Sequence, residues 1–527
     1  MKLQDADMLE LVNFVAGRRV PGTGAGTVLR DPLSGEPLAR ADSTGLDLPG
    51  AYAWARQEGG AALRALSYAE RAALLARVAE VLQANRDKYY DIALRNAGTV
   101  RQDSAIDIEG GIYTLSYYAK LGAKLEGQAF RPDGEPVSLA RDDAYAVQHI
   151  AVPARGLALL INAFNFPSWG LWEKAAPALL SGVPVVAKPA TATAWLAHEM
   201  VADVLAAHVL PEGALSLVCG ASAGLLDALA PGDVLSFTGS ADTAALLRAH
   251  PRVARDALRM NAETDSLNCA LLGPDAAAGG AAFDALVHEA VREITVKSGQ
   301  KCTAIRRILV PQEAYQRVAD AIASRLAAVT VGNPRNADVR MGSLVGRAQH
   351  DDVQAGIQAL RAGSQVLFDG GQVRLLDADP AVAACVAPWL LGSPDPDNHP
   401  LAHDREVFGP LATLMPYRDA AHAYALARRG QGSLVASVYS DDSAFLARSA
   451  LELADSHGRV HLVSPEAART HTGHGNVMPQ SLHGGPGRAG GGEELGGLRA
   501  LALYHRRAAI QGAPARLRGL ADAAGAT

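Results

Sequence analysis

Short apolar runs alternate with longer amphipathic stretches from residue 157 onward, and this alternation constrains the fold more than any other feature. LALLIN (157–162) and VPVVAKP (183–189) are dominated by apolar residues and bounded by Gly or Pro. Between them, SWGLWEKAAPALLSG (168–182) repeats apolar residues at helical spacing. Short strands separated by helices of about ten residues are typical of βαβ units. The sequence therefore predicts an α/β fold whose parallel sheet is covered on both faces.

Polar motifs follow three of the predicted strands. They are NFP (165–167), KPAT (188–191) and FTGS (237–240). Parallel sheets bind ligands at the carboxyl ends of their strands, and a helix that starts there offers free N–H groups to a phosphate. The pattern therefore predicts a ligand site at this edge. None of these three strand-end turns carries a GxGxxG motif, so the turn at Gly239 and Ser240 alone does not identify a dinucleotide.

The remaining segments predict further elements. A long amphipathic helix is expected over 67–98, and a β-hairpin or extended arm over 127–153. The Gly/Ala-rich stretch 275–282 is interpreted as a linker or the entry to another domain. Residues 481–497 are too glycine-rich for a regular element and predict a loop. The low-complexity segment 516–527 is expected to be disordered.

Composition and charge exclude several classes of protein. Hydrophobic residues make up 49% of the chain, which is enough for more than one core. The net charge of -6 arises from 49 basic and 55 acidic residues, a balance too even to indicate nucleic acid or a membrane surface as the main partner. The first residues lack a basic stretch followed by an apolar run, and no long apolar run occurs. We expect a soluble cytoplasmic protein.

The four cysteines, at positions 219, 269, 302 and 385, lie far apart and form no CxxC motif. No histidine cluster lies near them in the sequence. This distribution argues against a disulfide scaffold and against a zinc site, so no metal is expected. It fits a protein of a reducing compartment.

Three residues are candidates for covalent chemistry at a carbonyl carbon. Cys302 follows Gly-Gln-Lys, which forms a plausible loop with hydrogen-bond donors, and a reactive cysteine needs such donors or positive charge. Glu263, 39 positions earlier, could activate water or the thiol, and Asn165 could donate to a developing oxyanion. Taken singly, each has a more common interpretation: a packing cysteine, a solvated acid and a helix-cap asparagine. Their order and placement after strands favour one shared site.

At this point the residues resemble the aldehyde dehydrogenase superfamily over nearly the whole chain. The motifs FNFP, VVAKPAT, FTGS, the glutamate of AETDSLN, GQKC and EVFGP occur in the order of that family. The resemblance implies a Rossmann-like cofactor domain, an α/β catalytic domain and a small β oligomerisation arm, with the chain assembled as a homodimer. The expected boundaries are 1–126 and 154–274 for the NADP-binding domain, 275–480 for the catalytic domain, and 127–153 with 498–515 for the arm, which RALALYHRR would complete.

The resemblance implies a role for each catalytic candidate. Cys302 would attack the aldehyde, and its backbone N–H together with Asn165 would hold the oxyanion. Glu263 would activate the water that hydrolyses the thioester. Lys174 and Glu494 match a pair that relays the proton away in related enzymes.

The resemblance also implies a nicotinamide cofactor. Lys188 would bind the adenosine ribose or its phosphate, Ser240 beside Gly239 the pyrophosphate, and Glu406, in the motif that also holds Phe408, the nicotinamide ribose. Many relatives that prefer NAD carry a glutamate where this chain has Thr191. A threonine removes the charge that would repel a 2′-phosphate, so we predict NADP over NAD.

The stretches AETDSLNCALLG, SGQKCTAIRR and HGGPGRAGGGEELGG resemble a subfamily that oxidises CoA-linked semialdehydes in phenylacetate and benzoate degradation. The sequence ends at Thr527 without the fused hydratase domain of the phenylacetate enzyme, so we expect the stand-alone benzoate type. Arg306 and Arg307 are candidates for the CoA phosphates, although surface arginines or internal ion pairs are more common. A general aldehyde dehydrogenase, an enzyme that transfers the acyl group to CoA and an inactive scaffold are the alternatives. A cofactor-free cysteine hydrolase would need a histidine beside Cys302, which the flanking motif does not contain.

Overall fold

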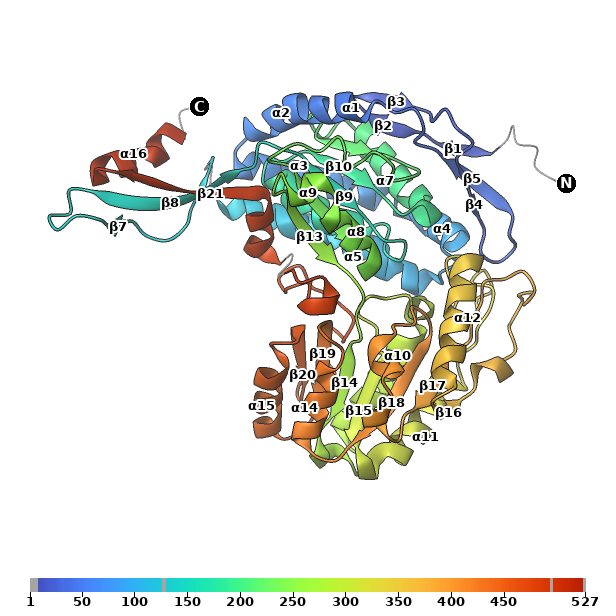
Figure 1. Ribbon diagram of the computed structural model, residues 1–527. Coiled ribbons are helices and arrows are strands. Elements are labelled where there is room, and N and C mark those ends of the chain that lie inside the picture. Colours follow the sequence, from blue (N-terminus) through green and yellow to red (C-terminus); the bar gives the residue numbers. More distant parts are fainter. Residues whose placement is uncertain (1–7, 126–128, 493–495, 525–527) are drawn as a thin grey trace.

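The computed structural model describes residues 8–125, 129–492 and 496–524, and its two large sheets lie one above the other in Figure 1. The first sheet has the order β13-β12-β9-β10-β11-β2-β3 and is parallel from β13 to β11. β2 and β3 are antiparallel additions at the far edge. The strand bounds are Arg259–Glu263 (β13), Val234–Thr238 (β12), Ala158–Ile161 (β9), Val185–Lys188 (β10), Leu215–Leu217 (β11), Asn13–Val15 (β2) and Arg18–Val20 (β3).

Both faces of this sheet are buried, as the uninterrupted apolar runs predict. Leu160 packs into one hydrophobic cluster, whereas Leu159 and Ile161 pack into another on the opposite face. The predicted long helix is two helices, which belong to the layer on the Leu160 face. That layer comprises α3 (Tyr68–Ala84), α4 (Arg86–Asn96), α5 (Arg101–Gly122), α6 (Trp169–Leu180) and α7 (Ala194–Ala206). The other face is covered by α1 (Leu48–Trp54), a π-helical turn (Ala55–Gly59) and α8 (Ala241–Ala249).

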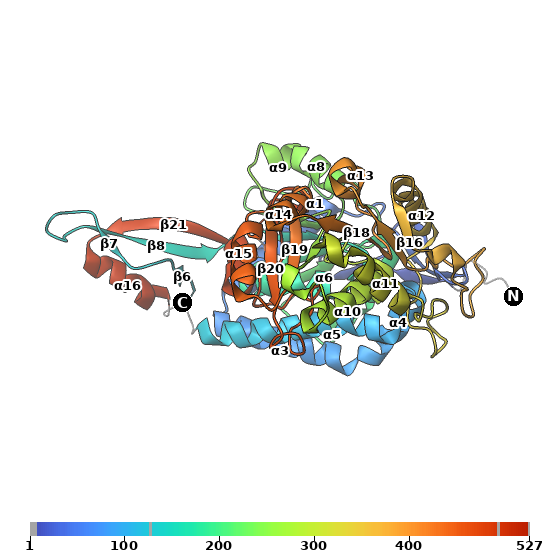
Figure 2. The ribbon, with the colours of Figure 1, turned by 90° about the horizontal axis from the view of Figure 1, so that it is seen from below.

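The second sheet repeats this construction with the order β16-β17-β18-β15-β14-β19-β20. Only β16 is antiparallel to its neighbour among these strands. Its strands are Gln365–Phe368 (β16), Trp389–Gly392 (β17), Leu411–Tyr417 (β18), Arg307–Pro311 (β15), Cys269–Leu272 (β14), Ser433–Tyr439 (β19) and His457–Val463 (β20). The helices around it, seen from below in Figure 2, are α10 (Ala281–Thr295), α11 (Tyr315–Leu326), α12 (Arg347–Arg361), α13 (Leu401–Asp404), α14 (Ala420–Arg428) and α15 (Ser443–Leu453).

The chain crosses between the two sheets at residues 264–268. β13 ends the first sheet at Glu263, and β14 begins the second at Cys269. The predicted boundary after residue 274 is therefore wrong by one strand. The Gly/Ala-rich stretch that suggested it joins β14 to α10 within the second layer. The crossing places the end of β13 directly beside the second sheet.

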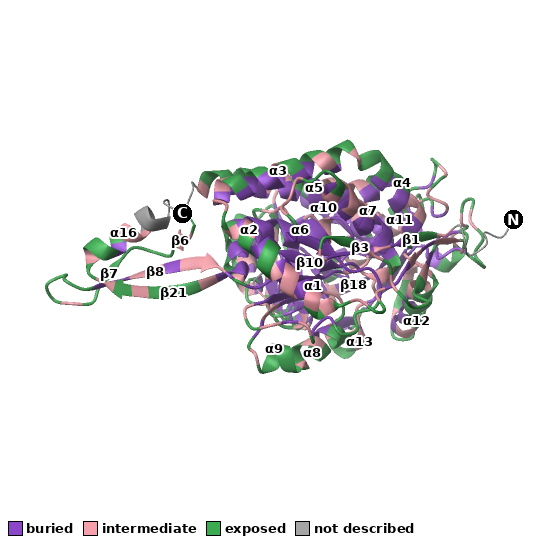
Figure 3. Ribbon diagram, turned by 90° about the horizontal axis from the view of Figure 1, so that it is seen from above, coloured by how far each residue is buried: buried purple, intermediate pink, exposed green. Residues whose placement is uncertain are grey.

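A third sheet forms the predicted arm, which projects from the body in Figure 1, and Figure 3 shows exposed residues along β21 but only buried and intermediate ones along β8. β8 (Ala146–Pro153) pairs along its whole length with β21 (His505–Gly512). Two short strands, β6 (Arg131–Pro132) and β7 (Val137–Ser138), complete the arm. Residues 499–504 of the predicted strand RALALYHRR lie instead in a 3-10 helix, Gly497–Tyr504. Segment 514–524 is helix α16 rather than the disordered tail expected from 516, because its alanine and leucine residues favour a helix.

The remaining elements lie at the periphery of the first layer. The strands β1 (Leu9–Leu11), β5 (Pro37–Ala41) and β4 (Thr27–Arg30) form a small sheet. The short helices α2 (Gly60–Arg64) and α9 (Pro251–Ala254) extend the layers that cover the first sheet. Over the described part of the chain, the helices are all too short or too polar to cross a membrane.

Candidate active site

Asn165, Glu263 and Cys302 line one pocket of about 460 Å³. Asn165 follows β9, Glu263 is the last residue of β13, and Cys302 precedes β15 of the second sheet. The sequence predicted that these three would share a site, and the structure brings them together. The other lining residues are Ala163, Phe166, Trp169, Gly170, Glu173, Lys174, Thr238, Thr303, Gly475, Val477 and His483.

Backbone geometry before Cys302 exposes its side chain to the pocket. α10 ends at Thr295, and Lys297 and Ser298 then adopt left-handed conformations with φ of 53° and 54°. Such φ values are uncommon outside glycine, so the surrounding contacts must hold the turn in place. The Asp103 carboxylate accepts a hydrogen bond of 2.8 Å from the Lys297 N–H, and the Ser298 hydroxyl donates to the carbonyl of Gly342 at 2.9 Å. Cys302 is the one cysteine of the four that is not buried.

The segment of Cys302 is fixed by amide side chains. Asn165 Nδ2 donates to the Gln300 carbonyl at 3.1 Å, and Asn268 Nδ2 donates to the Cys302 carbonyl at 2.8 Å. The Asn165 amide therefore lies against the loop that carries Cys302, with its N–H group directed to that loop. This placement suits a donor for negative charge that develops on a substrate oxygen beside Cys302.

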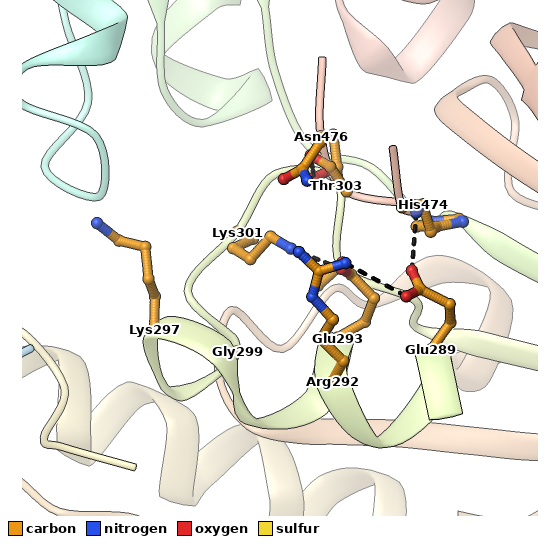
Figure 4. A network of polar contacts seen from close by, with 12 residues as sticks. Glu289, Arg292, Glu293, Lys297, Gly299, Lys301, Thr303, His474 and Asn476 are labelled. Atoms are coloured by element: carbon orange, nitrogen blue, oxygen red, sulfur yellow. Dashed lines mark hydrogen bonds and ion pairs between the residues drawn. The ribbon is translucent and has the colours of Figure 1, made fainter. Parts of the chain in front are cut away.

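Lys301, which precedes Cys302, forms an ion pair away from the thiol. Its Nζ lies 2.6 Å from Oε1 of Glu293, and both side chains are buried (Figure 4). Glu293 lies on α10, so the ion pair ties the residue before Cys302 back to the preceding helix. Lys301 therefore holds the loop and does not pair with the sulfur.

His483 occupies the place beside Cys302, although the motif that flanks Cys302 in the sequence contains no histidine. A ring nitrogen of His483, the Cys302 sulfur and a carboxylate oxygen of Glu263 all lie within 4.8 Å of one another. His483 Nδ1 lies 2.5 Å from Oε1 of Glu173, and Nε2 lies 3.2 Å from Oε1 of Glu263. The only signal in the sequence is a histidine at the start of the glycine-rich segment HGGPGRAGGG.

The charges of the pocket determine the protonation of these groups. Burial raises the pKa of Glu263, but His483 and Lys174 lower it further, to about 2, so the carboxylate is ionised. Burial and the Glu263 carboxylate raise the pKa of the Cys302 thiol to about 12, against a lowering by His483. Burial lowers the pKa of His483, but the carboxylates of Glu173 and Glu263 raise it well above its ordinary value. The imidazole is therefore protonated at neutral pH.

Lys174 lies beside the two carboxylates of the pocket. Its Nζ is 3.5 Å from Oε2 of Glu173 and 4.0 Å from Oε2 of Glu263. Both α6 residues are oriented by the start of that helix, where the Asp107 carboxylate accepts a 2.7 Å hydrogen bond from the Trp169 N–H. Glu494, the predicted partner of Lys174, lies outside the described residues.

Four of the predicted cofactor residues lie at the carboxyl edge of the first sheet. Lys188 ends β10 and Thr191 begins the next helical turn, where its hydroxyl donates to the Gly220 carbonyl at 3.0 Å. Gly239 follows β12, and Ser240 caps α8. Lys188 is buried, and no ion pair to it occurs within the described ranges. An ammonium without an ion pair and the N-terminus of a nine-residue helix, both at this edge of the sheet, fit the phosphates of a dinucleotide.

Glu406 and Phe408 are both in contact with Arg306. Arg306 Nε is 3.3 Å from Oε1 of Glu406, and its guanidinium lies 5.6 Å from the centre of the Phe408 ring. The Ser266 N–H donates to Oε2 of Glu406 at 3.0 Å. Burial raises the pKa of Glu406 to about 7, although Arg306 lowers it. Its carboxylate is therefore half ionised near neutral pH.

Arg306 and Arg307 are not available to CoA phosphates. Arg306 donates to the carbonyls of Gly299, Lys301 and Gly409, and Arg307, which is fully buried, donates to those of Leu267, Leu426 and Ala427. The alternative that these arginines serve internal interactions is therefore confirmed. Their donors hold segments of the second sheet together.

Comparisons with known proteins agree with this arrangement. The model of the aldehyde dehydrogenase family matches residues 23–501. The chain is 53% identical over 479 residues to 3,4-dehydroadipyl-CoA semialdehyde dehydrogenase of Aromatoleum evansii, covering 91% of this chain and 93% of that protein. It is also 46% identical over 178 residues to protein MaoC of Klebsiella aerogenes, which covers 34% of this chain and 52% of that protein.

Solved structures share the fold at low sequence identity. HpcC from Thermus thermophilus superimposes with a TM-score of 0.83 at 23% identity, covering 95% of this chain and 93% of that one. Lactaldehyde dehydrogenase from Escherichia coli gives a TM-score of 0.83 at 21% identity, with 96% and 99% covered. These likenesses confirm the predicted α/β architecture.

Proposed function

The chain belongs to the aldehyde dehydrogenase family, and we propose that it oxidises the aldehyde of a CoA-linked semialdehyde to a carboxylic acid. The proposed substrate is 3,4-dehydroadipyl-CoA semialdehyde, on the basis of the 53% identity to the dehydrogenase of that name. The single observation that carries the activity is the shared pocket of Cys302, Asn165 and Glu263. Aerobic benzoate degradation is the proposed metabolic setting.

In this proposal Cys302 attacks the aldehyde carbon, and the carbonyl oxygen becomes an oxyanion. The Asn165 amide and the Cys302 backbone N–H hold that oxyanion as the thiohemiacetal forms. Their donors are in place before the substrate arrives, because Asn165 already lies against the loop at the Gln300 carbonyl. Preformed donors stabilise the developing charge without reorganisation during the reaction.

Glu263 activates the water that hydrolyses the resulting thioester. A base must be ionised, and the cations of Lys174 and His483 keep the Glu263 carboxylate in that form. Lys174 in turn contacts Glu173, so a chain of ionisable groups leads from the base into α6. We propose that Lys174 passes the proton away along this chain, with Glu494 as its further partner.

The proposed cofactor is NADP, which accepts the hydride from the thiohemiacetal. Lys188 and Thr191 would hold the adenosine ribose with its 2′-phosphate, and Gly239 with Ser240 the pyrophosphate. The support for NADP is that Lys188 has no carboxylate partner within the described ranges and that Thr191 carries no charge. Glu406 would accept hydrogen bonds from the nicotinamide ribose, with Phe408 packed beside it.

The arm suggests that the proposed enzyme is a homodimer. β21 forms one edge of the arm sheet, and exposed apolar side chains occur nearby at Val137, Leu139 and Tyr145. An open edge with exposed apolar residues is suited to pairing with a second copy. Sedimentation equilibrium measures this directly: a mass of twice 54.8 kDa supports the dimer, and a monomer at micromolar concentration contradicts it.

We also propose a cytoplasmic location, since all four cysteines are free. Free thiols persist where glutathione and thioredoxin keep them reduced. Fractionation of cells that produce the chain would test the location, and recovery from an oxidising compartment with oxidised cysteines would contradict it.

Absorbance at 340 nm tests the activity with purified protein, NADP or NAD, and two aldehydes. One aldehyde is the CoA-linked semialdehyde, and the other is a short free aliphatic aldehyde. Rapid reduction with the CoA-linked substrate alone supports the proposed substrate. Equal or faster reduction with the free aldehyde identifies a general aldehyde dehydrogenase, and formation of acyl-CoA from added free CoA identifies acyl transfer instead of hydrolysis.

A further inference from the structure

His483 lies between two carboxylates and the nucleophile, a position that the proposed reaction has not yet used. The side chain of His483 is 10% exposed, and Glu173 contacts its Nδ1 at 2.5 Å. Its Nε2 lies 3.2 Å from Glu263 Oε1, yet neither of these buried atoms has a hydrogen-bond partner among the described residues. Nε2 therefore has an unused hydrogen-bonding position within the pocket that holds the Cys302 sulfur.

The neighbours of the imidazole hold it as a cation. Two carboxylates face it, one on each side, and a carboxylate at this distance favours the protonated ring. Burial alone lowers the pKa of His483, but Glu173 and Glu263 raise it well above its usual range. The charged groups around the imidazole and the sulfur are Glu173 and Lys174 of α6, Glu263 of β13, Arg306 before β15, and Arg459 of β20.

The other cations near the sulfur are occupied elsewhere. Lys301 pairs with Glu293 at 2.6 Å. Arg306 pairs with Glu406, and Arg459 donates to the carbonyls of Asn476 and His474. Lys174, another cation that lines the pocket, contacts Glu173 and Glu263. Among the described lining residues, His483 is therefore the cation with a ring nitrogen that lacks a hydrogen-bond partner close to the sulfur. A thiolate in a buried pocket needs such a partner.

We propose that the His483 imidazolium stabilises the Cys302 thiolate and that it turns from the Glu263 carboxylate to the sulfur as the thiol ionises. In this step the S–H bond breaks, its proton passes to water, and the electron pair stays on sulfur. The sulfur then presents a negative charge to Nε2 beside the ionised Glu263 carboxylate, while His483 keeps its own proton. Glu173 holds Nδ1 and fixes the ring plane throughout.

This proposal rests on the proposed function only for its catalytic consequence. A cation that faces both groups keeps the pocket charge balanced while the proton moves, which lowers the cost of forming a buried thiolate. Loss of that cation raises the apparent pKa of the thiol. Each unit of increase lowers the thiolate fraction at neutral pH about ten-fold.

The test measures the thiol directly, without aldehyde or cofactor. The full chain is alkylated with iodoacetamide between pH 5.5 and 10, and the Cys302 peptide is quantified by mass spectrometry. In H483Q, which keeps a polar side chain but loses the charge, we expect the curve of alkylation rate against pH to shift by at least one unit toward higher pH. The rate at pH 7 should fall about ten-fold or more. A profile that coincides with that of the wild type overturns the proposal.

A second variant acts in the opposite direction and guards against a folding failure of H483Q. In E263Q the carboxylate that competes for the imidazolium is gone, so the midpoint of Cys302 alkylation should move to lower pH. The double variant E263Q/H483Q also lacks His483, so the shift of Cys302 alkylation to lower pH should disappear. If alkylation of E263Q instead becomes ten-fold slower at pH 7, Glu263 and not His483 generates the thiolate, and the proposal is wrong.

His474 provides the matched control. It is a buried histidine, and its Nδ1 bonds to the Ser437 hydroxyl at 2.6 Å, whereas its backbone N–H donates to Glu289 (Figure 4). H474Q should leave the pH profile of Cys302 alkylation unchanged. If H474Q shifts the profile as much as H483Q does, the shift comes from general repacking of the site, and the proposal is overturned. If the wild type fails to reduce cofactor while H483Q still shifts the alkylation profile, the proposed function fails and the role of His483 stands.

Discussion

Lys301 Nζ lies 2.6 Å from Glu293 Oε1, and the two side chains are 1% and 0% exposed. The pair connects the residue before the nucleophile to the last turns of α10. Oε2 of Glu293 has no hydrogen-bond partner among the described residues. The buried negative charge of Glu293 is therefore neutralised mainly by Lys301. The contact positions Cys302 without touching it.

Replacing Lys301 by Met should therefore destabilise the protein. Removal of one partner of a buried pair leaves an uncompensated charge, which costs about 3–5 kcal/mol. Urea denaturation followed by tryptophan fluorescence measures the shift. The double variant E293Q/K301M removes both charges and should recover most of the loss, whereas an unchanged midpoint in K301M would show that the pair is not stabilising.

Cys302→Ala should abolish aldehyde oxidation without unfolding the chain. The reaction loses its nucleophile, so kcat should fall by at least about 10³-fold. Cofactor reduction at 340 nm and the thermal unfolding midpoint are measured on the same sample. C385A is the matched control, because Cys385 is buried far from the pocket beside the Gly332 carbonyl and should keep full activity. Substantial turnover in C302A would show that Cys302 is not the nucleophile.

The KM for NADP should depend on pH through Glu406. Burial raises the pKa of Glu406 to about 7, so the folded protein carries a carboxyl group below that pH and a carboxylate above it. A carboxylate accepts hydrogen bonds from ribose hydroxyls better than its protonated form does. The ionised fraction falls about ten-fold from pH 8 to pH 6, and KM should rise correspondingly.

E406Q provides the control for this dependence. Glutamine cannot titrate, so the variant should bind NADP more weakly at pH 8 and show a flatter pH profile. The phosphate of the cofactor titrates near pH 6 in both proteins, and the comparison removes its contribution. If KM depends on pH with the same slope in the wild type and in E406Q, Glu406 is not the group that causes the dependence.

Thr191→Glu should reverse the cofactor preference. A carboxylate at this position repels a 2′-phosphate and accepts bonds from the free ribose hydroxyls of NAD. We expect kcat/KM with NADP to fall about ten- to hundred-fold, on the order of 1.4–2.8 kcal/mol. T191V loses the hydroxyl bond to the Gly220 carbonyl but adds no charge, so it should keep the NADP preference. Comparable kcat/KM for NADP and NAD in the wild type would contradict the proposed preference for NADP.

The sequence predicts most of the first layer because its signals are local. Apolar runs followed by polar motifs locate the ends of β9, β10 and β12, and parallel strands bring those ends to one edge. The predicted domain boundary after residue 274 was wrong because it also relied on a local signal. The glycines at 279 and 280 mark a break in secondary structure, but the chain had already changed sheets in a polar segment without glycine, 264–268.

The environment of Cys302 could not be read from its neighbours in sequence. Lys301 precedes the sulfur but turns to Glu293, while His483 comes from a loop 181 positions later. A glycine-rich segment has no periodicity from which a direction can be inferred. Arg306 and Arg307 illustrate the same limit, because charged residues are rarely buried unless paired, and only the fold supplies the carbonyls that bind them.

The arm has a consequence for the order in which the chain is made. β8 pairs with β21, and roughly 350 residues separate the two strands along the chain. Ribosomes add about 5–20 residues per second, so β8 emerges on the order of 20–70 s before its partner strand exists. During that interval β8 has an unpaired edge, and other nascent chains offer competing edges. The arm therefore closes only after every residue that lines the pocket has been made, and the edge of β8 stays open to pairing with other chains until then.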